Sequence, residues 1–267
     1  MYRLGLVGNP VKESLSPGIH QTFLKMFDLK GIYDLHEVED LEGSGVIEQL
    51  KREEYHGFNV TIPFKESIIL YLDELDGHAI RMGAVNTVKN VDGRWIGYNT
   101  DGIGYYRSLK NYYPEFTNEL KNKKVLIIGA GGAAKGILYI LQDNGVSQAD
   151  LTNRTISRAE NLADLYNNSE AKSISQAEAD LASYDLVIQT TPLSRSKQSL
   201  ISLTNLSDNT IASDIVYHPK KTPFLEKAEE IGCSLLFGES MLWEQAAESF
   251  EIWTGLEVNK NYFNNKL

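Results

Sequence analysis

The chain has 267 residues, of which 42% are hydrophobic and 23% charged, and its formal net charge is −10. This length allows two domains of ordinary size, and the composition is that of a folded globular protein. The acidic balance argues against nucleic acid or an anionic membrane surface as a general partner, and the single cysteine excludes an internal disulfide.

The amino-terminal stretch is too short and too polar for a secretory signal, and no apolar run approaches the length of a membrane span. We therefore expect a cytoplasmic protein, and the sequence does not distinguish a monomer from a homodimer. We expect no metal, because the five histidines are scattered and no ligand spacing stands out.

The first hundred residues alternate between strand and helix patterns. Strands are predicted over 3–8, 33–38 and 57–62, and helices over 17–29, 43–52 and 65–75. Two further strands, 85–91 and 94–98, are joined by Asp92-Gly93, which is a strong hairpin signal. The order predicts an α/β layer whose mostly parallel sheet becomes mixed at the hairpin.

A helical segment over 102–112 and a polar stretch over 113–123 lead into a second alternation. Strands at 124–129, 148–153, 185–190, 210–216 and 233–237, with helices between most of them, predict a doubly wound, Rossmann-type domain. We expect the last helix, 239–257, to cross back to the first domain. The domains are then 1–101 plus 245–267, which would bind substrate, and 102–244, which would bind a nucleotide, with a cleft between them.

The turn after the strand at 124–128 is typical of a dinucleotide site. Gly129 and Gly131 let the backbone turn tightly and approach a pyrophosphate, and the following helix offers free N–H groups to that anion. An NAD site usually has an acid about 20 residues further on, but here Asn153-Arg154-Thr155 ends the second strand and Arg158 follows. A guanidinium can hold the 2′-phosphate that an acid would repel, so the sequence predicts NADP(H).

Polar residues also gather at helix starts and strand ends of the first domain. Ser14-Leu15-Ser16-Pro17 is typical of a helix start with Ser16 as N-cap. A cap explains Ser16 but not Ser14. Two hydroxyls at the start of a helix can together bind a small carboxylate. Lys65 follows a strand and Pro63 at a predicted helix start, where the helix dipole disfavours a cation. Such a residue is a functional candidate, with a solvated lysine as the alternative.

Together these motifs resemble the NADP-dependent shikimate dehydrogenase family. The matching segments are 14–17, 59–65, 83–87, 99–102, 129–133, 153–155, 214–223 and 238–246, in order along the chain. The resemblance implies reversible NADPH-dependent reduction of 3-dehydroshikimate to shikimate, a step of chorismate and aromatic amino-acid biosynthesis.

The resemblance also implies residue roles. Lys65 and Asp101 would form the catalytic acid–base pair. The substrate would be bound by Ser14 and Ser16 at its carboxylate and by Thr61, Asn86, Tyr217 and Gln245 at its ring hydroxyls, with Asn59 lining the same pocket. The cofactor would contact Gly129, Ala130, Gly131, Gly132, Ala133, Asn153, Arg154, Thr155, Arg158, Thr190, Ile215 and Gly238.

The chain departs from the family pattern at Glu13, where His is frequent, at Gln21, where Asn is frequent, and at Ser194-Arg195, where a glycine is usual. The last departure would affect how the nicotinamide half is seated. Two alternatives stay open: a quinate/shikimate dehydrogenase of relaxed substrate or cofactor choice, and a non-catalytic NADP-binding regulator on the same scaffold. Retention of Lys65, Asp101, Asn86 and Gln245 together argues against the regulator, because a sensor needs no proton donor.

Overall fold

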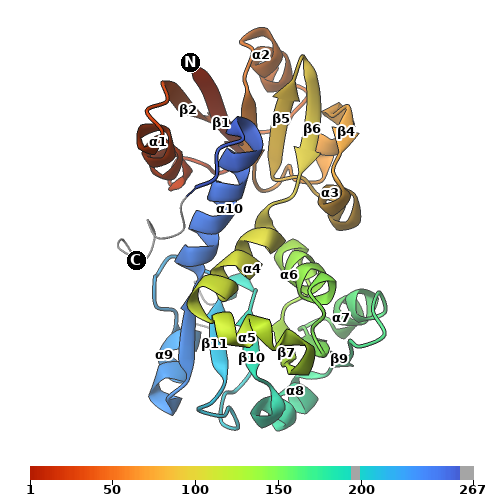
Figure 1. The fold of residues 1–267 in the computed structure, drawn as a ribbon. Helices are drawn as coiled ribbons and strands as arrows, with labels where there is room; N and C mark the ends of the chain where they lie inside the picture. Colours follow the sequence, from red (N-terminus) through yellow and green to blue (C-terminus); the bar gives the residue numbers. More distant parts are fainter. Residues whose placement is uncertain (194–198, 259–267) are drawn as a thin grey trace. The chain divides into compact units, whose positions relative to one another are not determined.

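The computed structural model describes residues 1–193 and 199–258, and these divide into two compact units. One unit holds Met1–Asp101 and the described chain from Gln245 onward, and the other holds Gly102–Glu244. Each is an α/β layer around a six-stranded sheet (Figure 1), so the predicted α/β fold class is confirmed. No helix in the described ranges is both long enough and apolar enough to cross a bilayer.

The first sheet is mixed. Its spatial order is β2 (Gly31–Glu37), β1 (Tyr2–Gly8), β3 (Gly57–Val60), β5 (Thr87–Val91), β6 (Arg94–Tyr98) and β4 (Glu74–Leu75). The strand β5 runs antiparallel to both β3 and β6, and the other neighbours are parallel. Asp92 and Gly93 both have positive φ, 52° and 86°, as a tight two-residue hairpin requires.

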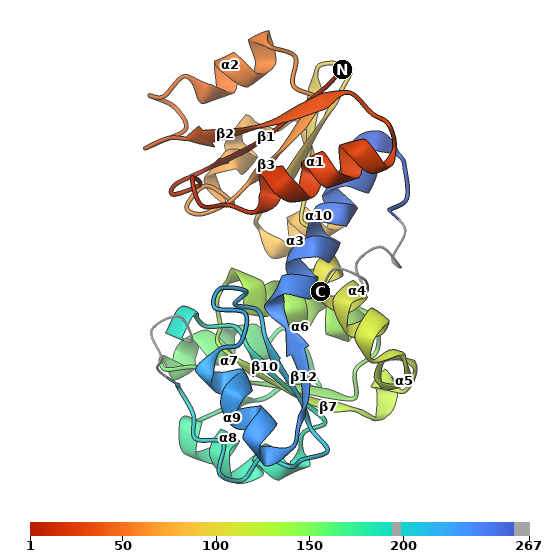
Figure 2. The ribbon, with the colours of Figure 1, turned by 90° about the vertical axis from the view of Figure 1, so that its left-hand side faces the viewer.

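Apolar side chains on both faces of this sheet hold its helices. On one face lie α1 (Ser16–Met26) and the later part of α10 (Gly238–Thr254), where the rings of Phe23 and Phe250 are 5.4 Å apart. The other face carries α2 (Val46–Arg52), the 3₁₀ turn η1 (Ser67–Tyr71) and α3 (Gly77–Met82), packed on Phe58, Val60 and Val88. Figure 2 shows α1 and α2 on opposite sides of the strands.

The second sheet is entirely parallel, in the order β12 (Ser234–Phe237), β11 (Ile211–Asp214), β10 (Leu186–Gln189), β7 (Lys124–Ile128), β8 (Gln148–Thr152) and β9 (Ala171–Lys172). One face carries α4 (Asp101–Tyr112), α5 (Pro114–Asn118), α6 (Gly132–Asp143) and α7 (Ile156–Ala163). The other carries α8 (Ile174–Asp180), η3 (Leu181–Ser183) and α9 (Pro223–Ile231). Helices on both faces explain why 125–128 is a continuous apolar run, since all four side chains are buried.

The prediction for one segment is wrong. The segment 65–75 is not an α-helix: only the short turn η1 forms, and Glu74 and Leu75 then pair with Ile96 and Gly97 as β4. Its apolar residues do not share one buried face, because Ile68 is fully buried whereas Leu70 is 85% exposed. The polar stretch 113–123 is partly helical, as α5 and the 3₁₀ turn η2 (Leu120–Asn122), because Phe116 and Leu120 are buried in the core.

Candidate active site

Lys65 and Asp101 form a close ion pair in the first unit. Lys65 Nζ lies 2.6 Å from Asp101 Oδ2, and the two side chains are 29% and 19% exposed. The backbone of Lys65 is held by Val85, whose N–H donates to the Lys65 carbonyl at 2.7 Å. Asp101 is the first residue of α4, where a helix dipole favours an anion. The pair is therefore fixed by the fold and still reachable by a small molecule.

Asn86 orients Asp101 from the other side. Its Oδ1 accepts the backbone N–H of Thr100 at 2.9 Å. A backbone N–H can only donate, so this bond fixes which end of the Asn86 amide is oxygen and points Nδ2 towards Asp101. The Nδ2 donates to Asp101 Oδ1 at 2.9 Å and to Thr100 Oγ1 at 3.0 Å. Both carboxylate oxygens of Asp101 are thus acceptors, one for Asn86 and one for Lys65.

Two further predicted substrate residues belong to the same group of contacts. Asn59 is buried, and its Nδ2 donates to the Asn86 carbonyl at 3.0 Å while its Oδ1 accepts from the Tyr33 hydroxyl at 2.8 Å. The carbonyl of Gln245 in α10 accepts from Thr100 Oγ1 at 3.1 Å. The structure therefore brings Lys65, Asp101, Asn86, Asn59 and the backbone of Gln245 together.

The two serines lie at the end of β1, on the loop that enters α1. The prediction that Ser16 caps this helix is wrong: the helix begins at Ser16, and the Ser14 hydroxyl accepts the Ser16 N–H at 3.2 Å. Glu37 holds the loop, because its Oε2 accepts the Val11 N–H at 3.0 Å and its Oε1 lies 2.9 Å from Lys12 Nζ. Ser14 and Ser16 thus follow the end of β1 and Thr61 follows the end of β3, the edge at which α/β sheets bind ligands.

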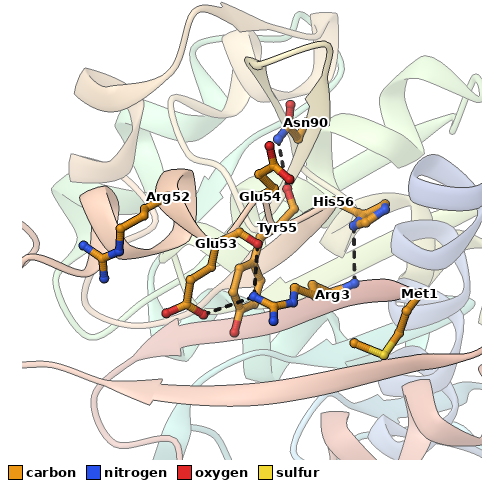
Figure 3. A pocket seen from close by; sticks show the side chains of 8 residues that line it. All are labelled: Met1, Arg3, Arg52, Glu53, Glu54, Tyr55, His56 and Asn90. Carbon is orange, nitrogen blue, oxygen red and sulfur yellow. Dashed lines mark hydrogen bonds and ion pairs between the residues drawn. The ribbon is translucent and has the colours of Figure 1, made fainter.

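A pocket of about 690 Å³ lies at the opposite edge of this sheet (Figure 3). It is lined by Met1, Arg3, Arg52, Glu53, Glu54, Tyr55, His56 and Asn90, close to where β1 and β3 begin. Its polar groups contact one another: Arg3 Nη1 lies 3.5 Å from Glu53 Oε2, and the Arg3 N–H donates to His56 Nδ1 at 3.3 Å. It shares no residue with the predicted site.

The glycine turn of the second unit fits a bound pyrophosphate. Gly129 has a φ of 125°, and a Cβ there would collide with the Thr190 hydroxyl, which itself donates to the Ile128 carbonyl at 2.8 Å. Gly131 and Gly132 at the start of α6 are exposed, and outside their own stretch of backbone no atom of the described residues lies within 4 Å of where their Cβ would be. Open backbone N–H groups at a helix start form an anion site.

The residues after β8 fit a 2′-phosphate. Arg154, Thr155 and Arg158 are all exposed, and the Asn153 Nδ2 donates to the Thr155 carbonyl at 2.9 Å, which shapes the turn into α7. The turn carries two guanidinium groups and no carboxylate, as an NADP site requires.

The remaining predicted cofactor residues, Ile215 and Gly238, touch each other's backbone. A Cβ on Gly238 would collide with the Ile215 carbonyl, so only glycine fits there.

Tyr217 is half-buried in the loop after β11, and it belongs to the second unit, unlike the other predicted substrate residues. Ser194 and Arg195 lie outside the described residues.

Sequence reasoning missed two residues that contact Asn59, namely Tyr33 in β2 and Ser249 in α10. Ser249 could have been found from the sequence, because it follows Gln245 by one helical turn and is polar on an apolar face. Tyr33 carries no such signal, since only the pairing of β2 with β1 brings it close.

A Rossmann-type unit joined to a unit that carries a half-buried lysine–aspartate pair defines a nucleotide-dependent dehydrogenase. Three family models match the chain: the shikimate dehydrogenase substrate binding domain over 6–88, shikimate / quinate 5-dehydrogenase over 114–215, and the shikimate 5′-dehydrogenase C-terminal domain over 238–267. The chain belongs to the shikimate dehydrogenase family, and it is an oxidoreductase that acts on a CH–OH group, so the resemblance seen in its motifs is confirmed.

Individual relatives agree with this assignment. The shikimate dehydrogenase (NADP(+)) of Oceanobacillus iheyensis is 46% identical over 96% of this chain and 93% of its own length. Shikimate dehydrogenase from Aquifex aeolicus is a similar solved structure, with a TM-score of 0.89, 35% identity, and 99% and 97% of the two chains covered. Shikimate 5-dehydrogenase from Thermus thermophilus, solved with NADP(H) and shikimate, has a TM-score of 0.87, 31% identity and 99% and 98% coverage.

Proposed function

We propose that this protein catalyses the reversible NADPH-dependent reduction of 3-dehydroshikimate to shikimate. The observation that carries the proposal is the Lys65–Asp101 pair at 2.6 Å, half-buried beside strand ends that present further hydrogen-bonding side chains. Family membership and a relative solved with both NADP(H) and shikimate support the same reaction.

The proton chemistry falls to Lys65. NADPH, when bound, supplies the hydride to the carbonyl carbon. Negative charge then grows on the carbonyl oxygen, where the Lys65 ammonium stabilises it and donates a proton. Asp101 holds the ammonium in place, and Asn86 holds Asp101 through its Nδ2. In the reverse direction neutral Lys65 accepts the proton from the substrate hydroxyl.

Substrate recognition is divided between the carboxylate and the ring hydroxyls. The Ser14 and Ser16 hydroxyls at the start of α1 bind the carboxylate, where the helix dipole favours an anion. The ring hydroxyls are bound by Thr61, Asn86, Gln245 and Tyr217. Asn59 supports the site from behind, because its amide is buried and already hydrogen-bonded to Tyr33 and to the Asn86 carbonyl.

NADP(H) is held by the second unit. The loop from Gly129 through Ala130, Gly131, Gly132 and Ala133 presents its N–H groups to the pyrophosphate. The turn made by Asn153, Arg154, Thr155 and Arg158 binds the adenosine ribose and its 2′-phosphate. Thr190, Ile215 and Gly238 follow the neighbouring strands and contact the nicotinamide half. The two guanidinium groups are the feature of this chain that favours NADP(H) over NAD(H).

A four-way assay tests the proposal. Purified protein is given shikimate or quinate with NADP⁺ or NAD⁺, and the near-ultraviolet absorbance of the reduced nicotinamide is followed. The highest kcat/KM is expected for shikimate with NADP⁺. Comparable turnover of quinate would favour the relaxed quinate/shikimate enzyme, to which the family model over 114–215 also refers. No turnover of either substrate would favour the NADP-binding regulator.

A further inference from the structure

A buried network of hydroxyl and amide groups lies behind the proposed catalytic pair. Its members come from separate elements of the first unit, and we call it the Asn59 network: Tyr33, Asn59, Asn86, Thr87, Thr100 and Ser249. Thr87, Thr100 and Ser249 are each 0% exposed. Removing a partner from such a group leaves a buried polar atom unsatisfied, which costs more than the bond itself contributes.

The donors and acceptors of the network are best defined at the Asn86 amide. Asn86 Nδ2 donates to Thr100 Oγ1, so the proton of Thr100 is free to go to the Gln245 carbonyl at 3.1 Å. Asn86 Oδ1 can accept the Thr87 hydroxyl at 3.0 Å. Either hydroxyl can donate the bond of 2.8 Å between Thr87 Oγ1 and Ser249 Oγ, because each has one proton and a second acceptor nearby: Asn86 Oδ1 for Thr87 and the Gln245 carbonyl for Ser249.

Ser249 has partners from three elements besides its own helix. Its Oγ accepts from Asn59 Nδ2 at 3.1 Å, and it lies 2.8 Å from Thr87 Oγ1 and 3.3 Å from Thr100 Oγ1. It also lies 2.9 Å from the Gln245 carbonyl, one turn earlier in α10. A single hydroxyl thus links strand β3, the start of β5, the loop before α4 and the helix that carries Gln245.

We propose that Ser249 is a positioning residue that fixes the rotation and height of α10 against Asn86, so that Gln245 and Asn86 meet the substrate hydroxyls together. The proposal rests on the proposed function of these two residues. Ser249 reaches Asp101 through Thr100, Thr87 or Asn59 and then Asn86, whereas it contacts the Gln245 carbonyl directly. Its loss should therefore weaken binding of the substrate more than it slows the chemical step.

The first test is Ser249→Ala, with Thr254→Val as the matched control. Thr254 makes the same kind of bond on the same helix, from its hydroxyl to the Phe250 carbonyl at 2.8 Å, but it is outside the network. We expect Ser249→Ala to raise KM for shikimate about 3–10-fold, the equivalent of one hydrogen bond, with kcat reduced less and KM for NADP⁺ unchanged. Thr254→Val should leave all three constants unchanged.

A second pair of variants covers the case in which Ser249→Ala does not fold. Tyr33→Phe removes the hydroxyl that fixes the Asn59 amide and keeps the ring stacked on His20, whose centroid is 4.6 Å away. Tyr55→Phe is its control, because Tyr55 donates an equally short bond of 2.8 Å to Asp34 at the far edge of the sheet. We expect KM for shikimate to rise several-fold in Tyr33→Phe and not in Tyr55→Phe.

The positioning role is overturned if neither Ser249→Ala nor Tyr33→Phe raises KM for shikimate above its control, or if either lowers kcat while KM stays fixed. Chemical denaturation of all four variants measures the loss of stability separately, so that a rise in KM for shikimate can be distinguished from general destabilisation. Wild-type protein that fails to oxidise shikimate would instead contradict the proposed function, which separates the two failures.

Discussion

Lys65 stands where the sequence predicts a helix start, a position unfavourable for a cation, and the structure removes that conflict. The segment after it forms only the turn η1 from Ser67, and Asp101 places a carboxylate 2.6 Å from its Nζ. The amine is therefore held by a carboxylate at the start of α4. The dipole conflict that singled out Lys65 depended on an α-helix that does not form.

If Lys65 is the acid–base group, Lys65→Ala should lower kcat by about 10²–10⁴-fold and change KM for shikimate far less. Lys172→Ala is a matched control, because Lys172 forms an ion pair of the same length, 2.6 Å, with Glu170 in the second unit. Steady-state kinetics of both variants decide the matter. Turnover near that of the wild type in Lys65→Ala would remove Lys65 from the mechanism.

His20 gives the fold a dependence on pH. Its ring is fully buried against Tyr33 and Trp253, and this burial lowers its pKa to about 3, which the neighbouring Asn59 opposes only in part. In the unfolded chain a histidine binds a proton near pH 6.5. Below that pH the unfolded state gains a proton that the native state refuses, so stability falls as the pH drops from about 6.5 towards 3.

We expect His20→Phe to flatten this dependence. The free energy of unfolding of the wild type should fall with a slope of up to about 1.4 kcal/mol per pH unit from this residue, and the variant should lack that part. His218→Gln serves as the control because His218 is exposed. Denaturant melts at several pH values between 6.5 and 4 measure the unfolding free energy of the wild type and of each variant. Equal slopes against pH in the wild type and in His20→Phe would contradict the role of His20.

At the scale of the element, the residue that caps α9 also forms a hydrogen bond to the end of β11. Thr222 caps it, since its Oγ1 accepts the Leu225 N–H at 3.4 Å, and it also donates to Asp214 Oδ2 at 2.7 Å. Asp214 is fully buried at the end of β11 and accepts the Val216 N–H through its other oxygen. The two side chains thereby close the loop that contains Tyr217.

Thr222→Val should therefore cost more than the loss of an ordinary cap. We expect about 2–3 kcal/mol of unfolding free energy, because the helix loses its cap and a buried carboxylate loses one of its hydrogen bonds. Ser173→Ala removes the exposed capping box of α8, formed with Gln176, and should cost only about 1 kcal/mol. Urea melts of the two variants compare them directly, and equal losses would show that the bond to Asp214 adds nothing.

The elements that were predicted well are determined by the backbone preferences of neighbouring residues. The Asp92-Gly93 hairpin forms as expected because both residues tolerate positive φ, and α6 begins at the glycine turn because Gly129 can adopt a φ of 125°. The helix expected over 17–29 ends at Met26, where Asp28 adopts a positive φ of 52°. Strand β9 and helix α3, each only a few residues long, were missed because short segments show no clear period.

At the scale of the molecule, cofactor binding and stability are linked. A ligand that binds only the folded state at 100 times its dissociation constant stabilises it by about 2.7 kcal/mol. NADP⁺ should therefore raise the melting temperature more than NAD⁺ at equal concentration, if Arg154 and Arg158 hold the 2′-phosphate. In Arg154→Asp the difference should shrink or vanish, because a carboxylate repels that phosphate.

Thermal melts with each nucleotide make this measurement without turnover. Arg107→Asp, on α4 and outside the proposed cofactor site, changes the net charge by the same amount and is the control. An unchanged preference for NADP⁺ in Arg154→Asp would mean that the 2′-phosphate is bound elsewhere. The control should retain the preference of the wild type.

The sequence by itself determined what depends on neighbouring residues: the glycine turn, the basic residues after β8, the hairpin and the motifs that carry the family resemblance. Local backbone preference and a short ligand-binding loop are encoded within a few positions, so a single stretch reveals them. The tertiary structure alone decided which distant side chains meet. Asn59 contacts Ser249 across 190 positions and Thr87 contacts it across 162, and the pairing of β2 with β1 brings Tyr33 to the same amide. Such contacts follow from strand order and helix packing, which no local pattern in the chain records.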